Sequence, residues 1–228
     1  TAAKSRTRAA KTDQTSRNTT ATRITRTKTI IKSIIKSIIK ITTGTKTMEA
    51  LIHSNERLDD LCRKGYRLIQ DPKLFCFGID AVLLSDYAKV KCGERAVDLC
   101  TGNGVIPILL EAKNNGEHYS GLELQPQCAD LARRSVKYNH LEDKVTIEEG
   151  DVCNASELFG RESVEVVTVN PPYMIGQHGI KNADDAMTIA RHEVRCTLDD
   201  IVRESAKMLK FNGRFYMVHR PFRLAEIF

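Results

Sequence analysis

Three polar residues lie where predicted strands end and the chain turns toward a helix. Asp98 lies at the end of RAVDL and opens the glycine loop DLCTGNG, Glu123 lies near the end of HYSGLEL, and Asp151 follows KVTIEEG. Glycines after a strand let the backbone approach a ligand, and a carboxylate after the next strand can accept hydrogen bonds from both ribose hydroxyls. Pro107 replaces the third glycine of a dinucleotide fingerprint, which argues against a bound pyrophosphate. These residues predict a pocket for a nucleoside with an uncharged 5′ extension, in which Asp151 accepts from an adenine amine.

A fourth strand end carries a rigid elbow. The run VEVVTV is typical of a buried strand, and Asn170, Pro171, Pro172 and Tyr173 follow it directly. Two consecutive prolines remove two backbone donors, so the strand cannot continue. The elbow presents an amide, an unpaired carbonyl and an aromatic ring at a fixed spacing, although a lone Pro-Pro pair is more often only a turn that ends a strand.

Strands and helices alternate along the chain, which indicates βαβ units and an α/β fold with a mostly parallel central sheet and helices on both faces. Thr197 and Asp200 form a predicted capping box, and Asn212-Gly213 is predicted to end the helix that follows. YRLIQ and LFCF read as two short strands around a turn. The other expected strands span 95–99, 118–124, 144–150, 164–169 and 214–220, and the helices span 78–90, 105–114, 125–139 and 198–209.

The composition divides the chain into two unlike parts. Of its 228 residues, 1–47 carry seven lysines and five arginines against one acid, a net charge of +11, so residues 48–228 have a net charge of −5. Residues 1–47 contain the repeat IIKSIIKSIIK and are predicted to be a disordered, low-complexity basic segment: an RNA-binding arm, an organelle presequence, or sequence that is not naturally coding, with the true start at Met48. We favour the last interpretation. The seven cysteines include no C-x-x-C pair, so neither a metal site nor a disulfide framework is expected.

Together these motifs carry a resemblance. DLCTGNG, Glu123, Asp151 and the Asn-Pro-Pro-Tyr elbow, in that order, resemble a class I methyltransferase that uses S-adenosylmethionine, of the subgroup that methylates planar amino or amide nitrogens. FCFGIDAVLL (75–84) and His219-Arg220-Pro221 narrow the resemblance to the bacterial valine-tRNA adenine-N6 methyltransferase family. Cys100 departs from the common first-loop pattern, which has glycine there. The resemblance covers about 55–228 and implies a Rossmann-like methyltransferase domain.

The resemblance implies roles for individual residues. The oxygens of Asn170 and Pro171 would accept the two N–H bonds of an adenine amine, Pro172 would help to fix the elbow, and Tyr173 would stack on the extruded base. Substrate contacts are expected from Phe77, Lys181, Arg191, His219 and Arg220. Cofactor contacts are expected from Asp98, Cys100, Thr101, Gly102, Gly104, Glu123, Leu124, Asp151, Val152 and Asn170.

Other functions stay open at this point. A protein glutamine N5-methyltransferase shares the elbow, and a guanine-N2 RNA target, a DNA adenine target or a catalytically silent RNA-binding subunit is also compatible. The resemblance further implies a tRNA partner, a cytoplasmic location and a monomeric full-length protein. No membrane or metal partner is expected, because no apolar run is long enough to span a membrane and the cysteines lack metal-ligand spacing. Because no residues follow PFRLAEIF to form the final β-hairpin of the class, residues 48–228 are expected to be a C-terminally incomplete domain.

Overall fold

The computed structural model describes residue 32, residues 50–74, 76–171 and 196–221, and residue 225. The chain divides into two compact units after Leu51. In the first unit only residues 32, 50 and 51 are described, so every element below belongs to the second unit, Ile52–Phe228. The boundary predicted at Met48 lies outside the described residues. No helix among the described residues is long and apolar enough to cross a membrane.

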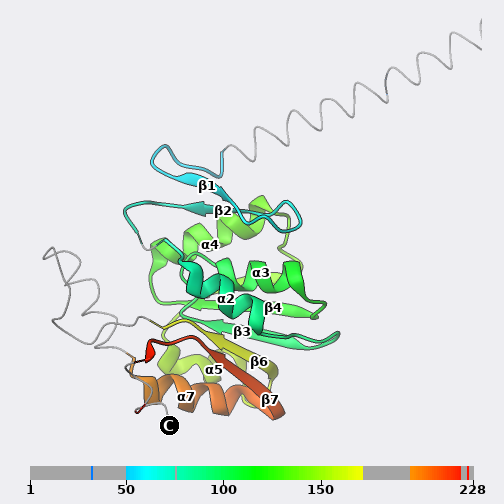
Figure 1. The fold of residues 1–228 in the computed structure, drawn as a ribbon, viewed down its shortest axis with the longest axis vertical. Helices are drawn as coiled ribbons and strands as arrows, with labels where there is room; N and C mark the ends of the chain where they lie inside the picture. Colours follow the sequence, from blue (N-terminus) through cyan, green and yellow to red (C-terminus); the bar gives the residue numbers. More distant parts are fainter. Residues whose placement is uncertain (1–31, 33–49, 75, 172–195, 222–224, 226–228) are drawn as a thin grey trace, which may run out of the picture. The chain divides into compact units, whose positions relative to one another are not determined.

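A five-stranded parallel sheet forms the centre of the second unit (Figure 1). The strand order β5-β4-β3-β6-β7 reverses between β3 and β6, because the chain runs outward from β3 to β5 and then returns to the other side of β3. In an open α/β sheet, the carboxyl ends of the strands at such a reversal form the usual ligand-binding crevice. The strands are β3 (Arg95–Leu99), β4 (His118–Glu123), β5 (Val145–Glu149), β6 (Val164–Val169) and β7 (Leu209–Met217).

Helices cover both faces of the sheet, as the alternating pattern predicts (Figure 1). Alternation along the strands divides the core, since Ala96 and Val166 pack with the helices of one face, whereas Val97 and Val167 pack with those of the other. The first face is covered by α2 (Ile79–Tyr87), α3 (Val105–Lys113) and α4 (Pro126–Tyr138). The second is covered by η1 (Val152–Asn154), α5 (Ala155–Phe159) and α7 (Leu198–Met208).

An antiparallel hairpin of β1 (Arg57–Asp60) and β2 (Arg67–Gln70) packs against α4. The C-terminal end of α4 is hydrogen-bonded to the β2 backbone. The amide N–H of Arg67 donates to Oδ1 of Asn139, the residue that follows α4, at 2.8 Å, and that of Ile69 donates to Ser135 Oγ at 2.9 Å. The prediction that LFCF forms the second strand is wrong, because no strand includes its described residues, Leu74, Cys76 and Phe77. Asp71 ends β2 instead, accepting from the backbone of Lys73 and Leu74.

The last strand begins earlier than predicted. Helix α7 ends at Met208, and Asn212-Gly213 lies inside β7 rather than at the end of the helix. The register with β6 shifts between Val164 and Val166, whose partners are Leu209 and Arg214. Asn212 has a φ of 61°, which an asparagine tolerates better than most residues, so the Asn-Gly pair forms an irregularity within the strand.

Candidate functional site

The glycine loop after β3 approaches the carboxyl ends of β3 and β4. The loop begins with Cys100, whose φ of 57° lies in the left-handed region that favours glycine, so the cysteine keeps a glycine-like turn at a steric cost. Gly102 has a φ of 58° and nothing within 4 Å of where its Cβ would be. Gly104 has a φ of 79°, and a Cβ there would lie 2.9 Å from that of Ala132. Gly102 therefore leaves open space beside the backbone, whereas Gly104 permits close packing against α4.

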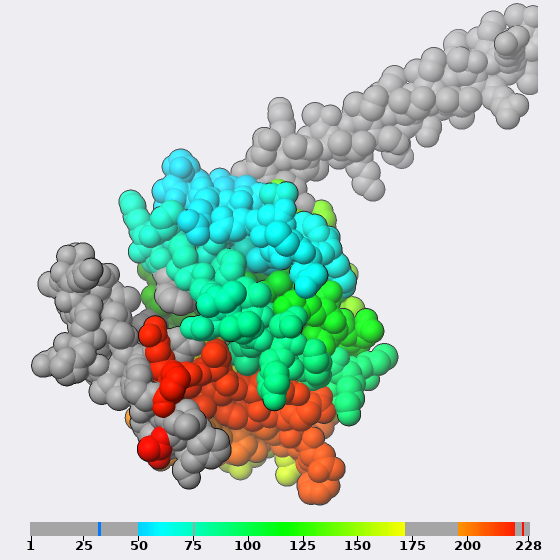
Figure 2. Space-filling model, in the orientation of Figure 1, coloured from blue at the N-terminus to red at the C-terminus, as the bar shows by residue number. Residues whose placement is uncertain are grey.

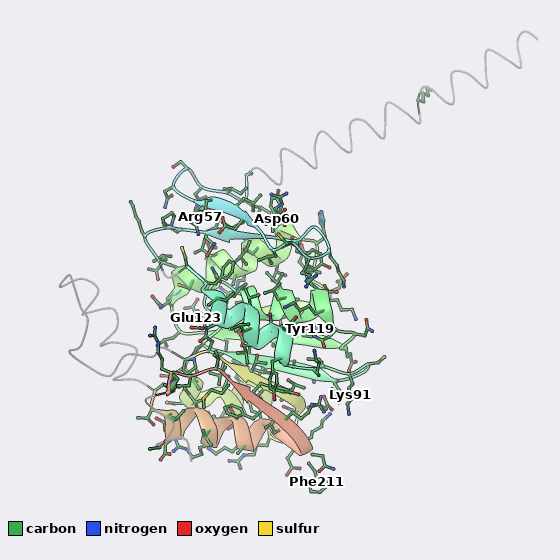
Figure 3. All side chains as sticks on the ribbon, viewed as in Figure 1. Arg57, Asp60, Lys91, Tyr119, Glu123 and Phe211 are labelled. Carbon is green, nitrogen blue, oxygen red and sulfur yellow. The ribbon has the colours of Figure 1, made fainter. Side chains whose placement is uncertain are left out.

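Glu123 ties the end of β4 to this loop. Its buried carboxylate accepts the backbone N–H of Gly102 through Oε2 and that of Gln125 through Oε1, both at 2.8 Å. Figure 3 shows Glu123 at the opposite end of the sheet from Lys91 and Phe211. Each carboxylate oxygen has more than one acceptor position, so this carboxylate can also accept from the hydroxyls of a ligand.

Asp98 is buried under the same loop, with 2% of its surface exposed. Its Oδ1 accepts the hydroxyl of Thr168 at 2.6 Å, across the β3–β6 pair. Its Oδ2 and the Oγ1 of Thr101 have no hydrogen-bond partner among the described residues. Burial raises the pKa of Asp98 to about 7; the nearby hydroxyls of Thr101 and Thr168 oppose this rise, and the charge of Glu123 adds to it. The Thr101 hydroxyl lies close enough to lower the pKa of Asp98, so these two atoms are neighbours, and the carboxylate has further acceptor positions for a ligand donor.

Asp151 and Val152 follow β5 at the same edge. The backbone N–H of Gly150 donates to the carbonyl of Glu123 at 2.9 Å, which holds the end of β5 beside the end of β4. Asp151 Oδ1 accepts the N–H of Cys153 at 2.9 Å and caps η1. Val152 is buried and Leu124 is half-buried. The structure therefore brings the predicted cofactor residues of three successive loops to one end of the sheet.

The elbow begins on the other side of the strand-order reversal. Val169, the last residue of β6, is in register with Leu99, so Asn170 and Cys100 follow adjacent strand ends. The carbonyl of Val169 accepts the N–H of Val218 at 3.2 Å, Asn170 is half-buried, and Pro171 is buried. The other residues predicted for the elbow and its following segment, Pro172, Tyr173, Lys181 and Arg191, lie outside the described residues.

The remaining predicted substrate residues flank α2 and β7. Phe77 and Val218 pack against the same core cluster, and the rings of Tyr87 and Tyr216 meet edge to face with centroids 5.9 Å apart. Figure 2 shows α2 and β7 side by side on one face. Phe77 precedes α2, and His219 and Arg220 follow β7, where the N–H of Arg220 donates to His219 Nδ1 at 2.8 Å.

A groove of about 760 Å³ runs between α2 and β7, but it is not the predicted cofactor pocket. Leu83 and Tyr87 line it from α2, and Tyr216, Met217 and Val218 line it from the other side. None of the predicted cofactor residues lines this groove. We therefore place the candidate site at the carboxyl ends of β3, β4, β5 and β6, on the basis of hydrogen bonds and register.

Two buried amides that the sequence prediction missed link the hairpin to the glycine loop. Gln70 is 1% exposed and Asn103 is 2% exposed. Gln70 Oε1 accepts the side-chain N–H of Asn103 at 3.0 Å and the backbone N–H of Phe77 at 3.2 Å, while its Nε2 donates to Asp59. Gln70 therefore joins the hairpin, the segment before α2 and the glycine loop. Gln70 directly follows the apolar pair Leu68-Ile69 in β2, and this polar residue at a strand end is the sequence signal that could have indicated the link.

Solved structures of similar fold come from different enzymes. A precorrin-8w decarboxylase from Methanobacterium thermoautotrophicum is 17% identical with a TM-score of 0.51, covering 70% of this chain and 74% of that chain. A predicted O-methyltransferase from Agrobacterium tumefaciens is 22% identical with a TM-score of 0.50, covering 65% and 64%. At these identities the likeness shows the fold alone, the class I methyltransferase arrangement of an α/β sheet.

Curated relatives share more specific names. The tRNA1(Val) (adenine(37)-N6)-methyltransferase of Porphyromonas gingivalis W83 is 26% identical over 156 residues, which are 66% of this chain and 60% of that protein. The protein of the same name from Histophilus somni 129Pt is 26% identical over 159 residues, 68% of this chain and 65% of its own length. The chain thus spans less than two thirds of the length of these relatives.

A family model accounts for most of the second unit. Residues 66–226 match the methyltransferase small domain family. The cofactor of such enzymes is S-adenosylmethionine, and the site fits it: Glu123 offers acceptors for ribose hydroxyls, Gly102 leaves space beside the backbone, and the unpartnered oxygen of Asp98 can take a donor. The chain belongs to the methyltransferase small domain family of S-adenosylmethionine-dependent methyltransferases.

Proposed function

We propose that this chain transfers a methyl group to the exocyclic N6 of an adenine in tRNA, specifically the adenine next to the anticodon of a valine tRNA. The observation that carries the proposal is the position of Asn170-Pro171 directly after β6, beside the glycine loop at the reversal of strand order. The names of the curated relatives support the choice of substrate. We further propose that the reaction takes place in the cytoplasm.

The elbow suits an amino group whose lone pair is delocalised into a ring. In our proposal the Asn170 Oδ1 and the Pro171 carbonyl accept the two N–H bonds of the adenine amine, which favours a pyramidal nitrogen with an available lone pair. Acceptors that are already in place before substrate binds stabilise the developing positive charge without reorganisation. Proline at position 171 restricts the backbone and helps to hold these two acceptors at a fixed spacing.

The protein otherwise acts by positioning. When bound, the cofactor supplies a methyl group already activated on a sulfonium. Glu123, Asp98 and Asp151 would hold the nucleoside and methionine parts, and the elbow would orient the amino nitrogen toward them. Such orientation can supply up to roughly 7–11 kcal/mol of the barrier. The product nitrogen then loses a proton, for which no general base is required.

Methyl transfer from tritiated S-adenosylmethionine tests the proposal. The substrates are an unmodified valine tRNA, the same tRNA with guanine in place of the adenine next to the anticodon, and a peptide-chain release factor. We expect label only in the first tRNA, recovered as N6-methyladenosine after nuclease digestion. Label in the release factor would indicate a glutamine methyltransferase, and label in 2-methylguanosine would indicate a guanine target. Either result, or no transfer to any of the three, would overturn the proposal.

A further inference from the structure

A cluster of two thiols and a carboxylate lies beside the candidate site and has no part in the proposed reaction. The donor atoms of Cys153, Cys196 and Asp200 all lie within 4.8 Å of one another, and all three residues are half-buried. Cys153 belongs to η1, Cys196 precedes α7, and Asp200 lies in the first turn of α7. This is the one such group among the residues that the structure describes.

The cluster is close to the size of a thiolate-rich zinc site. Zinc binds cysteine sulfur at about 2.3 Å and carboxylate oxygen at about 2.0–2.2 Å, so the ligands of a tetrahedral site lie roughly 3.5–3.8 Å apart. Contraction of each donor–donor distance by at most about 1.3 Å would therefore bring the three donors onto one ion. Because η1 and the first turn of α7 each carry at least one donor, the ion would cross-link these two elements.

The carboxylate of the trio is already oriented. Asp200 Oδ2 accepts the backbone N–H of Thr197 at 3.0 Å and its hydroxyl at 2.7 Å, and Oδ1 pairs with Arg203. These contacts form the capping box of α7, which confirms the prediction for Thr197 and Asp200. Metal-bound carboxylates are commonly held by hydrogen bonds of this kind, and each oxygen has a further lone pair for an ion. The thiol of Cys196 lies over the start of the helix, 3.6 Å from the carbonyl of Thr197.

We propose that Cys153, Cys196 and Asp200 form a binding site for a thiophilic divalent cation of the zinc class. Binding releases the two thiol protons to the solvent and replaces them by bonds from the thiolates to the metal, and water completes the tetrahedron. No change of oxidation state is involved, so the site needs no oxidant. The sequence spacing does not reveal it, because Cys153 and Cys196 are far apart in the chain and neither belongs to a C-x-x-C pair.

Cobalt(II) titration of the reduced, chelator-treated full chain tests this site without requiring methyltransferase activity. We expect one equivalent to bind with a thiolate-to-cobalt charge-transfer band, and zinc to displace it. Cys153→Ser and Cys196→Ser should each lower the affinity at least about tenfold, and Asp200→Asn, which keeps a cap acceptor, should lower it about tenfold. Cys62→Ser and Cys92→Ser, at exposed positions elsewhere, are the matched controls and should leave the band unchanged.

A second measurement uses the unaltered protein and so does not depend on whether a variant folds. Mass spectrometry after brief alkylation should show that zinc protects Cys153 and Cys196 but not Cys62. The proposal is overturned by the absence of saturable cobalt binding, by a charge-transfer band that survives removal of both thiols, or by equal alkylation with and without zinc. It is also overturned if non-reducing peptide maps show a Cys153–Cys196 disulfide in place of a bound ion.

Discussion

Asp98 combines deep burial with an unpaired oxygen. Its Oδ2 has no partner among the described residues, and burial raises its pKa to about 7, opposed by the hydroxyls of Thr101 and Thr168. Such a carboxylate is costly in the ionised form until a ligand donates to it. We therefore expect the cofactor site to depend on pH through this residue.

The pH dependence of unfolding should report Asp98. Because its folded pKa is raised above the ordinary value of 3.8, its contribution to stability is fully present below about pH 4 and is lost as the pH rises to about 7. Asp98→Asn cannot ionise, so it should gain about 1–3 kcal/mol relative to the natural protein between pH 5 and 7, measured by urea unfolding. Asp143→Asn, at an exposed position, should leave the profile unchanged. A constant difference between Asp98→Asn and the natural protein would contradict the buried, protonated carboxyl.

Asn170, also named among the expected cofactor contacts, is expected to contribute mainly in the transition state. Asn170→Ala should lower the rate of methyl transfer by about 10²-fold or more, with S-adenosylmethionine affinity by calorimetry nearly unchanged. Asn170→Asp keeps an acceptor oxygen and should retain more activity than the alanine variant. If Asn170→Ala kept more than about a tenth of the rate, or if the aspartate variant were the less active of the two, the acceptor role would be wrong.

At the scale of elements, the glycine loop is held from two sides. Glu123 binds it from the end of β4, and Gln70 binds Asn103 from the end of β2. The hairpin is in turn fixed to α4, where Arg134 forms two 2.7 Å hydrogen bonds to the carboxylate of Glu56. We therefore propose that the N-terminal hairpin helps to position the glycine loop rather than only covering the core.

Gln70→Leu tests this coupling. Leucine is apolar and leaves the amide of Asn103 and the N–H of Phe77 without their acceptor, so we expect a loss of about 2–4 kcal/mol in unfolding free energy and a higher KM for S-adenosylmethionine. In a double-mutant cycle, Gln70→Leu with Asn103→Leu should cost less than the sum of the single changes. Strict additivity, or an unchanged KM in a folded Gln70→Leu protein, would show that the hairpin does not position the loop.

At the scale of the whole molecule, the order of the strands creates the candidate site. The reversal between β3 and β6 places the loops that follow these two strands at one crevice. The loop after β3 carries predicted cofactor residues, and the loop after β6 carries the proposed hydrogen-bond acceptors. The methyl donor and the amino group that receives the methyl would therefore meet at the one position where neighbouring loops diverge toward opposite faces of the sheet.

Residues 1–47 are predicted to be dispensable for this arrangement, because their composition and repeat offer no apolar core. A protein that begins at Met48 should match the full chain in Tm by calorimetry and in methyl transfer to valine tRNA. A markedly weaker affinity for tRNA after removal of residues 1–47 would instead support an RNA-binding arm.

The sequence by itself determined the alternation of strands and helices, the position of the glycine loop and the capping box of α7. These features follow from short-range physics: hydrophobic periodicity, the conformational freedom of glycine, and hydrogen bonds within one turn. For that reason the predicted bounds of the five sheet strands agree with the structure to within a few residues, except that β7 starts five residues earlier than predicted. The same agreement holds for the helices predicted at 78–90, 105–114, 125–139 and 198–209. The resemblance to a methyltransferase also rested on such local motifs.

Only the tertiary structure decided which segments meet. It paired β2 with β1 instead of LFCF, placed Asn212-Gly213 inside β7, joined Gln70 to Asn103, and brought Cys153 near Cys196. Each of these contacts depends on how whole elements pack, and residues far apart in the chain leave no periodic signal of their proximity. Local patterns therefore located the strand ends that could bind a ligand, whereas the strand order and long-range packing determined which of those ends share a site.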